Sequence, residues 1–142
     1  MATVKQILDG KGYQVWTITA DKMVYDALRL MGEKEIGALA VVEGGMLVGI
    51  LSERDYAGKV VLRGKTSRET LIREIMTSPA ICIRPDQSVA ECMTLMTDKR
   101  IRHLPVLDNG KLIGMISLGD LVKSVIDEQQ FTIQQLEGYI GQ

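Results

Sequence analysis

The chain has 142 residues, of which 46% are hydrophobic and 25% are charged. This composition is typical of one globular domain or of two closely packed half-domains, and it excludes a disordered or fibrous protein. The formal net charge of −1 gives no general attraction to nucleic acid or to anionic membranes. No apolar run approaches the roughly 20 residues that cross a bilayer, and the first residues lack the pattern of a signal peptide. We therefore expect a cytoplasmic protein that does not contact a membrane.

The sequence contains an internal duplication. When it is shifted by 65 residues, positions 17–55 align with positions 82–120 without a gap, and 14 of the 39 pairs are identical. Composition alone would give only about two or three identities. A unit this short encloses too little interior to be secure alone, so we expect two pseudo-symmetric repeats that pack together.

The first repeat follows a short N-terminal segment. Val4, Ile7 and Leu8 predict one helical turn, which we expect to pack beside the first repeat. The hydrophobic pattern then predicts elements in the order strand, helix, hairpin and helix. Their expected ranges are 15–19, a helix from Asp21, 38–42 with 46–51, and 55 to about 62.

The second repeat has the same predicted order. Residues 63–70 are polar and turn-rich, which is typical of a linker, and residues 71–76 predict another helical turn. The elements expected after it are a strand at 80–84, a helix from Ser88, a hairpin of 104–107 with 112–117, and a helix from Gly119. We expect domain boundaries that separate residues 1–68, 69–127 and 128–142.

A C-terminal tail has no counterpart in the first repeat. Residues 118–126 and 131–140 both carry apolar side chains at helical spacing. The tail is predicted either to cover the protein's own core or to form a contact surface between two copies of the chain.

Each repeat closes with a glycine, two apolar residues, a serine and, three residues later, an aspartate. These motifs end at Ser52 and Asp55 in the first repeat and at Ser117 and Asp120 in the second. The start of a helix offers unpaired N–H groups, and a carboxylate there can accept hydrogen bonds from paired sugar hydroxyls, although it repels phosphate. The simpler interpretation is a capping box, but two copies in one short chain favour ligand sites.

The two motifs differ in the basic residues near them that are suited to a phosphate. Arg102 and His103 precede the strand that pairs with the one leading to Ser117, so they could face the same cleft as Asp120. The first repeat has Gly37 and Ala38 at the equivalent positions and instead carries Arg54 inside its Ser-x-x-Asp turn. The alternative to a phosphate site is that residues 99–103 are only a charged segment exposed to solvent. The pattern predicts two related but unequal sites.

The reactive residues needed for catalysis are scarce. The chain has one histidine and two cysteines, with neither a Ser/His/Asp pattern nor zinc-like ligand spacing. We therefore expect no enzyme, no metal site and no catalytic cofactor. Cys82 and Cys92 are predicted to be buried thiols, and redox sensing is the alternative role for them.

Taken together, these motifs resemble a tandem pair of cystathionine β-synthase-type (CBS) domains. The resemblance rests on the two Gly-h-h-Ser-x-x-Asp motifs, on R-H-L-P-V-L-D at 102–108, on S-E-R-D-Y at 52–56 and on E-I-M-T at 74–77. It implies an α/β (α+β) fold of two β-α-β-β-α repeats in a disc-like Bateman module. It also implies two clefts that bind adenine-containing ligands such as AMP, ADP, ATP, NAD or S-adenosylmethionine.

The resemblance further implies which residues bind. In the family the aspartates hold the ribose, the serines lie near ribose or phosphate, basic residues contact phosphate, and strand residues hold adenine. Carried onto this chain, the implied ligand-binding residues are Thr17, Ile50, Ser52, Arg54, Asp55, Ile81, Cys82, Arg102, His103, Pro105, Met115, Ser117 and Asp120.

The sequence thus predicts a regulatory sensor of adenine nucleotides that acts through a homodimer or an unknown regulated protein. A structural dimerisation module without a physiological ligand is the alternative. Nucleic-acid binding through residues 99–103 is disfavoured by the slightly acidic net charge.

Overall fold

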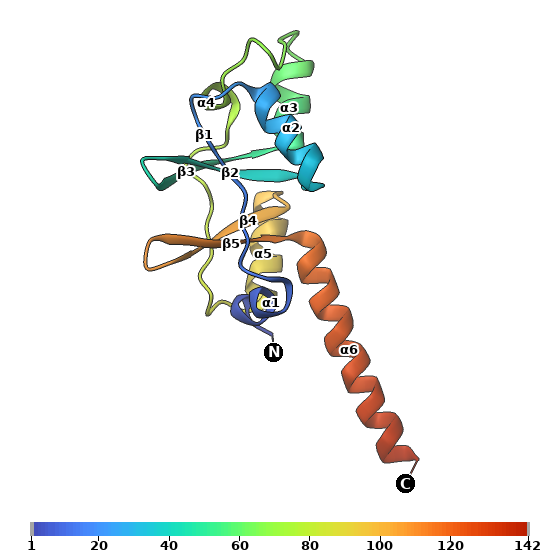
Figure 1. The fold of residues 1–142 in the computed structure, drawn as a ribbon. Coiled ribbons are helices and arrows are strands. Elements are labelled where there is room, and N and C mark those ends of the chain that lie inside the picture. The colour runs from blue at the N-terminus through green and yellow to red at the C-terminus, as the bar shows by residue number, and fades with distance from the viewer. Residues whose placement is uncertain (1, 142) are drawn as a thin grey trace. The chain divides into compact units, whose positions relative to one another are not determined.

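The computed structural model describes residues 2–141, which divide into two compact units. One unit consists of residues 15–81 and contains the first repeat. The other combines residues 2–14 with residues 82–141 and contains the second repeat. We call them the first-repeat unit and the second-repeat unit (Figure 1). Both mix helices with strands, which confirms the predicted α/β class.

The first-repeat unit is built on a three-stranded sheet. Strand β1 (Thr17–Thr19) runs parallel to β2 (Ala38–Glu43), and β2 runs antiparallel to β3 (Met46–Ser52). The helical elements are α2 (Val24–Lys34), α3 (Glu53–Tyr56), a π-helical turn η1 (Ala57–Val61) and α4 (Ile72–Ile75). The predicted hairpin and the helix after it are confirmed, although that helix changes to π-helical hydrogen bonding at Ala57.

Helical spacing explains the core of this unit. Val24, Ala27 and Met31 lie three or four residues apart on α2, so they share one face, and all three are buried. Leu39 and Val41 point to one side of β2 because alternate strand residues share a face, and they belong to the same buried cluster. This packing fixes α2 over the hairpin that leads to Ser52.

The second-repeat unit repeats this arrangement with α5 (Val89–Lys99), β4 (His103–Asp108), β5 (Lys111–Ser117) and α6 (Leu118–Ile140). The predicted strand at 80–84 is wrong, because only Ile83 forms a single parallel bridge to Val106. In the other unit, the N–H of Ala40 donates to the carbonyl of Trp16. The equivalent residue, Pro105, has no N–H, so this part of the ladder lacks a donor.

The N-terminal helix α1 (Val4–Lys11) packs on the second repeat, so the expected contact with the first repeat is wrong. The N–H of Val4 donates to the carbonyl of Gln87 at 2.9 Å. Leu8 is fully buried directly against Gly114, where an added Cβ would lie 2.7 Å from Leu8 Cδ2. In the first-repeat unit, Met76 and Thr77, which directly follow helix α4, take the matching place next to Gly49.

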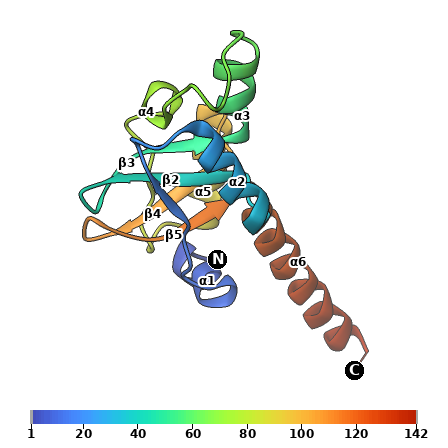
Figure 2. The ribbon, with the colours of Figure 1, turned by 45° about the horizontal axis from the view of Figure 1, so that its top comes forward.

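The predicted C-terminal helices form one continuous helix. Helix α6 spans 23 residues and begins against α1, α5 and β5 of its own unit. It then extends away from these elements (Figure 2). Every residue from 126 to 141 is exposed. Among the described residues, the tail therefore does not cover the core of its own unit.

Candidate functional site

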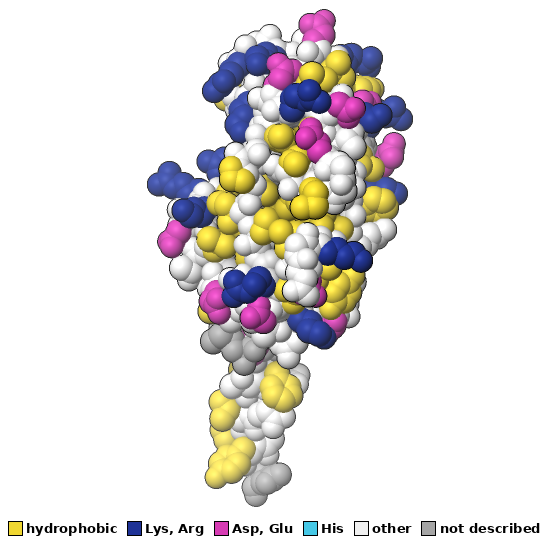
Figure 3. All heavy atoms as spheres, turned by 90° about the vertical axis from the view of Figure 1, so that its left-hand side faces the viewer, with side chains coloured by type: hydrophobic (Ala, Val, Ile, Leu, Met, Phe, Trp, Pro, Cys, Tyr) yellow, Lys and Arg dark blue, Asp and Glu magenta, His cyan; other side chains and the backbone are white. Residues whose placement is uncertain are grey.

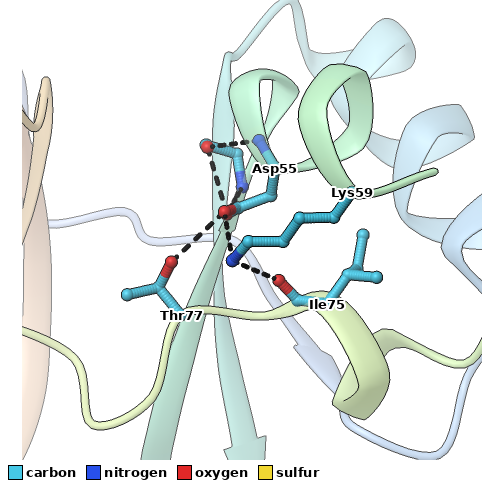
Figure 4. Close-up of polar contacts among 5 residues, drawn as sticks. Asp55, Lys59, Ile75 and Thr77 are labelled. Carbon is cyan, nitrogen blue, oxygen red and sulfur yellow. Dashed lines mark hydrogen bonds and ion pairs between the residues drawn. The ribbon is translucent and has the colours of Figure 1, made fainter. Parts of the chain in front are cut away.

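Asp55 lies at the first turn of α3 and is almost fully engaged. Ser52 caps this helix, and its backbone N–H and hydroxyl both donate to Asp55 Oδ2, at 3.0 and 3.1 Å. The other oxygen, Oδ1, accepts from the Thr77 hydroxyl at 3.2 Å and lies 3.0 Å from the Lys59 ammonium (Figure 4). Lys59 also donates to the carbonyl of Ile75 at 3.0 Å.

These contacts leave Asp55 little capacity for a ligand. A carboxylate has about four acceptor positions, and here four donor contacts fill them. The residue is also only 9% exposed. In this arrangement Asp55 stabilises the turn, and a sugar would have to displace Lys59 or Thr77 to bind it.

Asp120 occupies the equivalent turn of α6 with a freer carboxylate. Oδ2 accepts from the Ser117 N–H at 2.8 Å and from Lys11 Nζ at 2.7 Å. Lys11 comes from α1 and also donates to the carbonyl of Met115 at 3.0 Å. Among the described residues, no hydrogen bond reaches Asp120 Oδ1. The second repeat therefore keeps an acceptor that the first repeat has used.

The environment of Asp120 favours its charged form. Burial raises the pKa of this carboxyl, but the hydrogen bonds from Lys11 and from the backbone and side chain of Ser117, together with the positive charge of Lys11, outweigh burial. The pKa of Asp120 therefore lies below its ordinary value, and the group is a carboxylate at neutral pH.

A hollow of about 580 Å³ lies between α1 and α6, and Asp120 and Lys11 line it. Its size falls in the range of small-molecule sites, roughly 300–1,000 Å³. The wall also includes Lys123, Asp127 and Glu128, so carboxylates and ammonium groups are nearly balanced. This hollow suits a neutral polar group such as a sugar better than a phosphate.

The basic pair lies beside the Ser117 turn, as the sequence predicted. His103 pairs with Ser117 in the β4–β5 register. The N–H of Leu118, the first residue of α6, donates to the carbonyl of Arg102 at 2.9 Å. Arg102 is exposed and His103 is half-buried. The fold thus brings Arg102, His103, Ser117 and Asp120 together at one end of the hairpin.

The strand residues predicted for adenine lie in equivalent rows. In the first-repeat unit, Ala40 of β2 pairs with Thr17 on one side and with Ile50 on the other. In the second-repeat unit, Pro105 pairs with Met115 and accepts from the N–H of Ile83, which follows Cys82. Ile81 is half-buried at the end of the first-repeat unit, and Arg54 is exposed on α3 next to Asp55.

Both cysteines are thiols of low reactivity. Cys92 is fully buried on α5, where burial and the neighbouring charge of Glu91 raise its pKa to about 11. Cys82 is only half-buried, not buried as predicted, and its pKa is also raised by burial. Both groups are therefore protonated at neutral pH.

Residues 2–141 contain neither a metal-binding cluster nor a helix suited to span a membrane. This part of the chain has no group of three or more His, Cys, Asp or Glu side chains placed to hold a metal ion. None of its helices combines the length and apolar character that crossing a bilayer requires.

The groups that bind the two aspartates were not predicted from the sequence. Lys59 lies four residues after Asp55, a spacing that brings charges together on a helix, so this pair could have been found. Lys11 is 109 residues from Asp120 and Thr77 is 22 residues from Asp55. No local pattern indicates those two contacts.

Known proteins share both the sequence and the fold. A family model for the CBS domain matches residues 5–61 and again residues 72–127. The CBS domain-containing protein CBSX3, mitochondrial, of Arabidopsis thaliana is 39% identical over 97% of this chain and 71% of its own length. A solved structure of a CBS-domain protein from Burkholderia ambifaria MC40-6 is 58% identical, with a TM-score of 0.88 over 93% of this chain and 99% of that one.

One solved neighbour contains ligands. The CBS domain pair of protein MJ0100 was determined in complex with 5′-methylthioadenosine and S-adenosyl-L-methionine. It is 25% identical, with a TM-score of 0.80 over 90% of this chain and 98% of that one. Together with the duplicated fold and the two family matches, these similarities show that the chain belongs to the CBS domain family and carries two CBS domains.

Proposed function

We propose that this protein is a regulatory module that senses an adenine nucleotide, of the AMP, ADP, ATP or NAD type, mainly through its second repeat. Proteins made only of CBS domains are generally regulatory. The observation that carries the proposal is the Asp120 carboxylate, which keeps one free acceptor oxygen beside a hollow and lies at the same hairpin end as Arg102 and His103.

The proposal divides the ligand between two sides of the Ser117 turn. Asp120 Oδ1 accepts from the ribose hydroxyls, which suits a charged acceptor with an open position. The phosphate lies toward Arg102 and His103, away from the three carboxylates of the hollow. The row formed by Cys82, Pro105 and Met115 offers an apolar surface for adenine.

The first repeat is proposed to bind more weakly or not at all. Its carboxylate is filled by Ser52, Thr77 and Lys59. It also has Gly37 and Ala38 where the second repeat has its basic pair. Arg54 remains as a cation for a phosphate, so a ligand that displaces Lys59 would have one charged contact.

The ligands of the MJ0100 domain pair support the adenine part of the proposal. 5′-Methylthioadenosine and S-adenosyl-L-methionine both contain adenosine, and AMP, ATP and NAD contain it too. A site that binds adenine and ribose therefore accommodates all of these ligands. The contacts to the group at the 5′ position then determine which of them binds most tightly. Arg102 and His103 favour members with a 5′ phosphate.

The sugar contact is tested by calorimetry with adenosine, AMP, ATP, NAD and S-adenosylmethionine on a matched pair of variants. Loss of charge-assisted hydrogen bonds to ribose costs about 1.5–3 kcal/mol, so Asp120→Asn is expected to weaken every ligand roughly 10- to 100-fold. Asp55→Asn is expected to leave the main binding event unchanged. Equal losses in both variants would contradict the assignment to the second repeat.

The phosphate contact is tested by Arg102→Ala. This variant is expected to weaken AMP and ATP about tenfold or more and to leave adenosine within about twofold, because only the nucleotides carry the anion that Arg102 contacts. Equal losses for adenosine and AMP would contradict this division.

A structural dimerisation module without a ligand remains the second candidate. It is favoured by the engaged state of Asp55 and by the exposed apolar surface of α6. Absence of heat and of any thermal shift with all five ligands would decide for it.

A further inference from the structure

Helix α6 carries an apolar stripe with a seven-residue period. Steps of four and three connect Val122, Ile126, Gln129, Ile133, Leu136 and Ile140, which correspond to alternating d and a positions of a heptad. Five of these six residues are aliphatic. At about 100° per residue they fall within an arc of roughly 80° on one side of the helix, so they form a narrow seam. We call these six residues the α6 seam.

Within residues 2–141, the apolar members of this seam are exposed. The exposed fractions of Val122, Ile126, Ile133 and Leu136 are 41%, 47%, 52% and 58%, and that of Ile140 is 80%. Hydrophobic side chains are visible along the projecting end of the helix in Figure 3. Uncovered aliphatic residues in a strict heptad are characteristic of a surface that pairs with another helix.

The seam is complementary to itself in an antiparallel register. In antiparallel pairs, a positions of one helix pack against d positions of the other. Pairing Val122 with Ile140 of a second copy simultaneously pairs Ile126 with Leu136, and Gln129 with Ile133. Every member of the seam thereby has a partner, and the overlap of residues 122–140 extends for roughly 28 Å.

The charges beside the seam match the same register. Lys123 and Glu137 both occupy e positions, which face each other across an antiparallel pair. The register that aligns the seam places Lys123 opposite Glu137 of the other copy, and two-fold symmetry repeats this contact. Gln130 then meets its own copy at the centre. A parallel pair would instead separate Lys123 from Glu137 by on the order of 20 Å.

We propose that α6 is a self-association surface that pairs antiparallel with α6 of a second copy of this chain. Two independent observations support this occupant: complete a-to-d matching of the seam and the symmetric Lys123–Glu137 pairs. The inference does not depend on nucleotide binding, because the pairing is measured with the ligand-free protein.

The seam is tested by light scattering of the whole protein over a range of concentrations. The unmodified chain is expected to show a concentration-dependent mass of twice the monomer or a multiple of it. Leu136→Glu places a charge inside the seam and is expected to raise the dissociation constant of the pair at least tenfold. Gln135→Glu adds the same charge outside the seam and is the matched control, with an expected change within about twofold.

The antiparallel register is tested by charge exchange. Lys123→Glu and Glu137→Lys each place like charges opposite one another and are expected to weaken pairing several-fold. The double variant Lys123→Glu/Glu137→Lys restores opposite charges and is expected to return to within about twofold of the unmodified chain. If both single changes weaken pairing and the double variant does not recover, the register is wrong. A chain that is monomeric at all concentrations, or that ignores Leu136→Glu, overturns the proposal altogether.

Discussion

The two motif aspartates use the same capping geometry but differ in their lysine. In the first repeat Lys59 follows Asp55 by one helical turn, whereas the equivalent of Lys59 in the second repeat is Ser124. There Lys11 of α1 supplies the ammonium group from outside the repeat. A lysine therefore neutralises the motif aspartate in both repeats, but it comes from the same helical segment in one and from α1 in the other. Only in the second repeat does one carboxylate oxygen, Asp120 Oδ1, keep an open acceptor position.

The Lys11–Asp120 pair predicts a pH-dependent part of stability. The pKa of Asp120 is lowered from 3.8, so the stabilisation is present at pH values above about 4 and is lost as pH falls through the lower, folded-state pKa. Lys11→Met is expected to lower the free energy of unfolding by up to about 1 kcal/mol at pH 7, since Lys11 is partly exposed. Denaturant melts between pH 7 and pH 3 should show this difference shrinking below pH 4.

A double-mutant cycle provides the control for this prediction. In the background of Asp120→Asn the ammonium group keeps its hydrogen bond to the Met115 carbonyl but loses its pairing with Asp120, so Lys11→Met should cost less than in the unmodified chain. A loss that stays the same in that background, or that does not change with pH, would show that Lys11 contributes through packing alone.

How far the site could be predicted follows from the distance of each contact along the chain. The Ser52–Asp55 and Ser117–Asp120 turns are local, and His103 lies opposite Ser117 because the hairpin register is set by its turn. Lys11 and Thr77 arrive through tertiary packing of α1 and of the segment after α4. No periodicity encodes such contacts, so the occupancy of each carboxylate was not predictable.

At the scale of elements, another segment of the same unit approaches each hairpin closely at its motif glycine: Met76 and Thr77 after α4 at Gly49, and Leu8 of α1 at Gly114. An added Cβ on Gly49 would lie 2.8 Å from the carbonyl oxygen of Thr77, and one on Gly114 would lie 2.7 Å from Leu8 Cδ2. The first neighbour is backbone and the second is the end of a side chain. The same motif position therefore tolerates a methyl group differently in the two repeats.

This difference predicts unequal costs for one substitution. Gly49→Ala forces a shift of backbone and is expected to lower the free energy of unfolding by about 1–3 kcal/mol. Gly114→Ala is expected to cost less, because Leu8 can change rotamer. Urea melts of the two variants measure this directly. The reverse order would mean that the buried Leu8 has less freedom than the Thr77 backbone.

The elements most faithfully predicted are those with strong local patterns. Both hairpins and helices α2 and α5 follow from alternating or helical spacing and from turn residues. The strand at 80–84 failed because a strand needs donors and acceptors on its neighbour, and Pro105 lacks the donor. Helix α6 was predicted as two helices because its polar residues 127–130 interrupt the hydrophobic pattern. A helix that is exposed on all sides needs no apolar face there, so the polar residues continue it.

At the scale of the whole molecule, the sequence repeats and the structural units differ in their boundaries. Helix α1 precedes the first repeat in sequence but completes the second-repeat unit, and α4 precedes the second repeat but completes the first-repeat unit. Both segments bury a short apolar face, Val4 and Leu8 on α1 and Ile72 and Ile75 on α4. Whether such a segment packs on the repeat next to it in sequence or on the other repeat depends on the path of the connecting chain. Sequence patterns do not encode this path, so the N-terminal turn was assigned to the wrong repeat.

The packing of α1 on the second repeat and of α4 on the first predicts which repeat is destabilised by a cavity in each core. Leu8 and Ile72 are both fully buried, and each is expected to cost about 2–5 kcal/mol when changed to alanine. Measured by hydrogen exchange, Leu8→Ala should reduce amide protection mainly in residues 82–121, although it lies before the first repeat. Ile72→Ala, the matched variant, should reduce protection mainly in residues 17–62, because local opening follows the unit that loses the contact. Loss of protection in the sequence-adjacent repeat in each case would contradict the exchanged packing of α1 and α4.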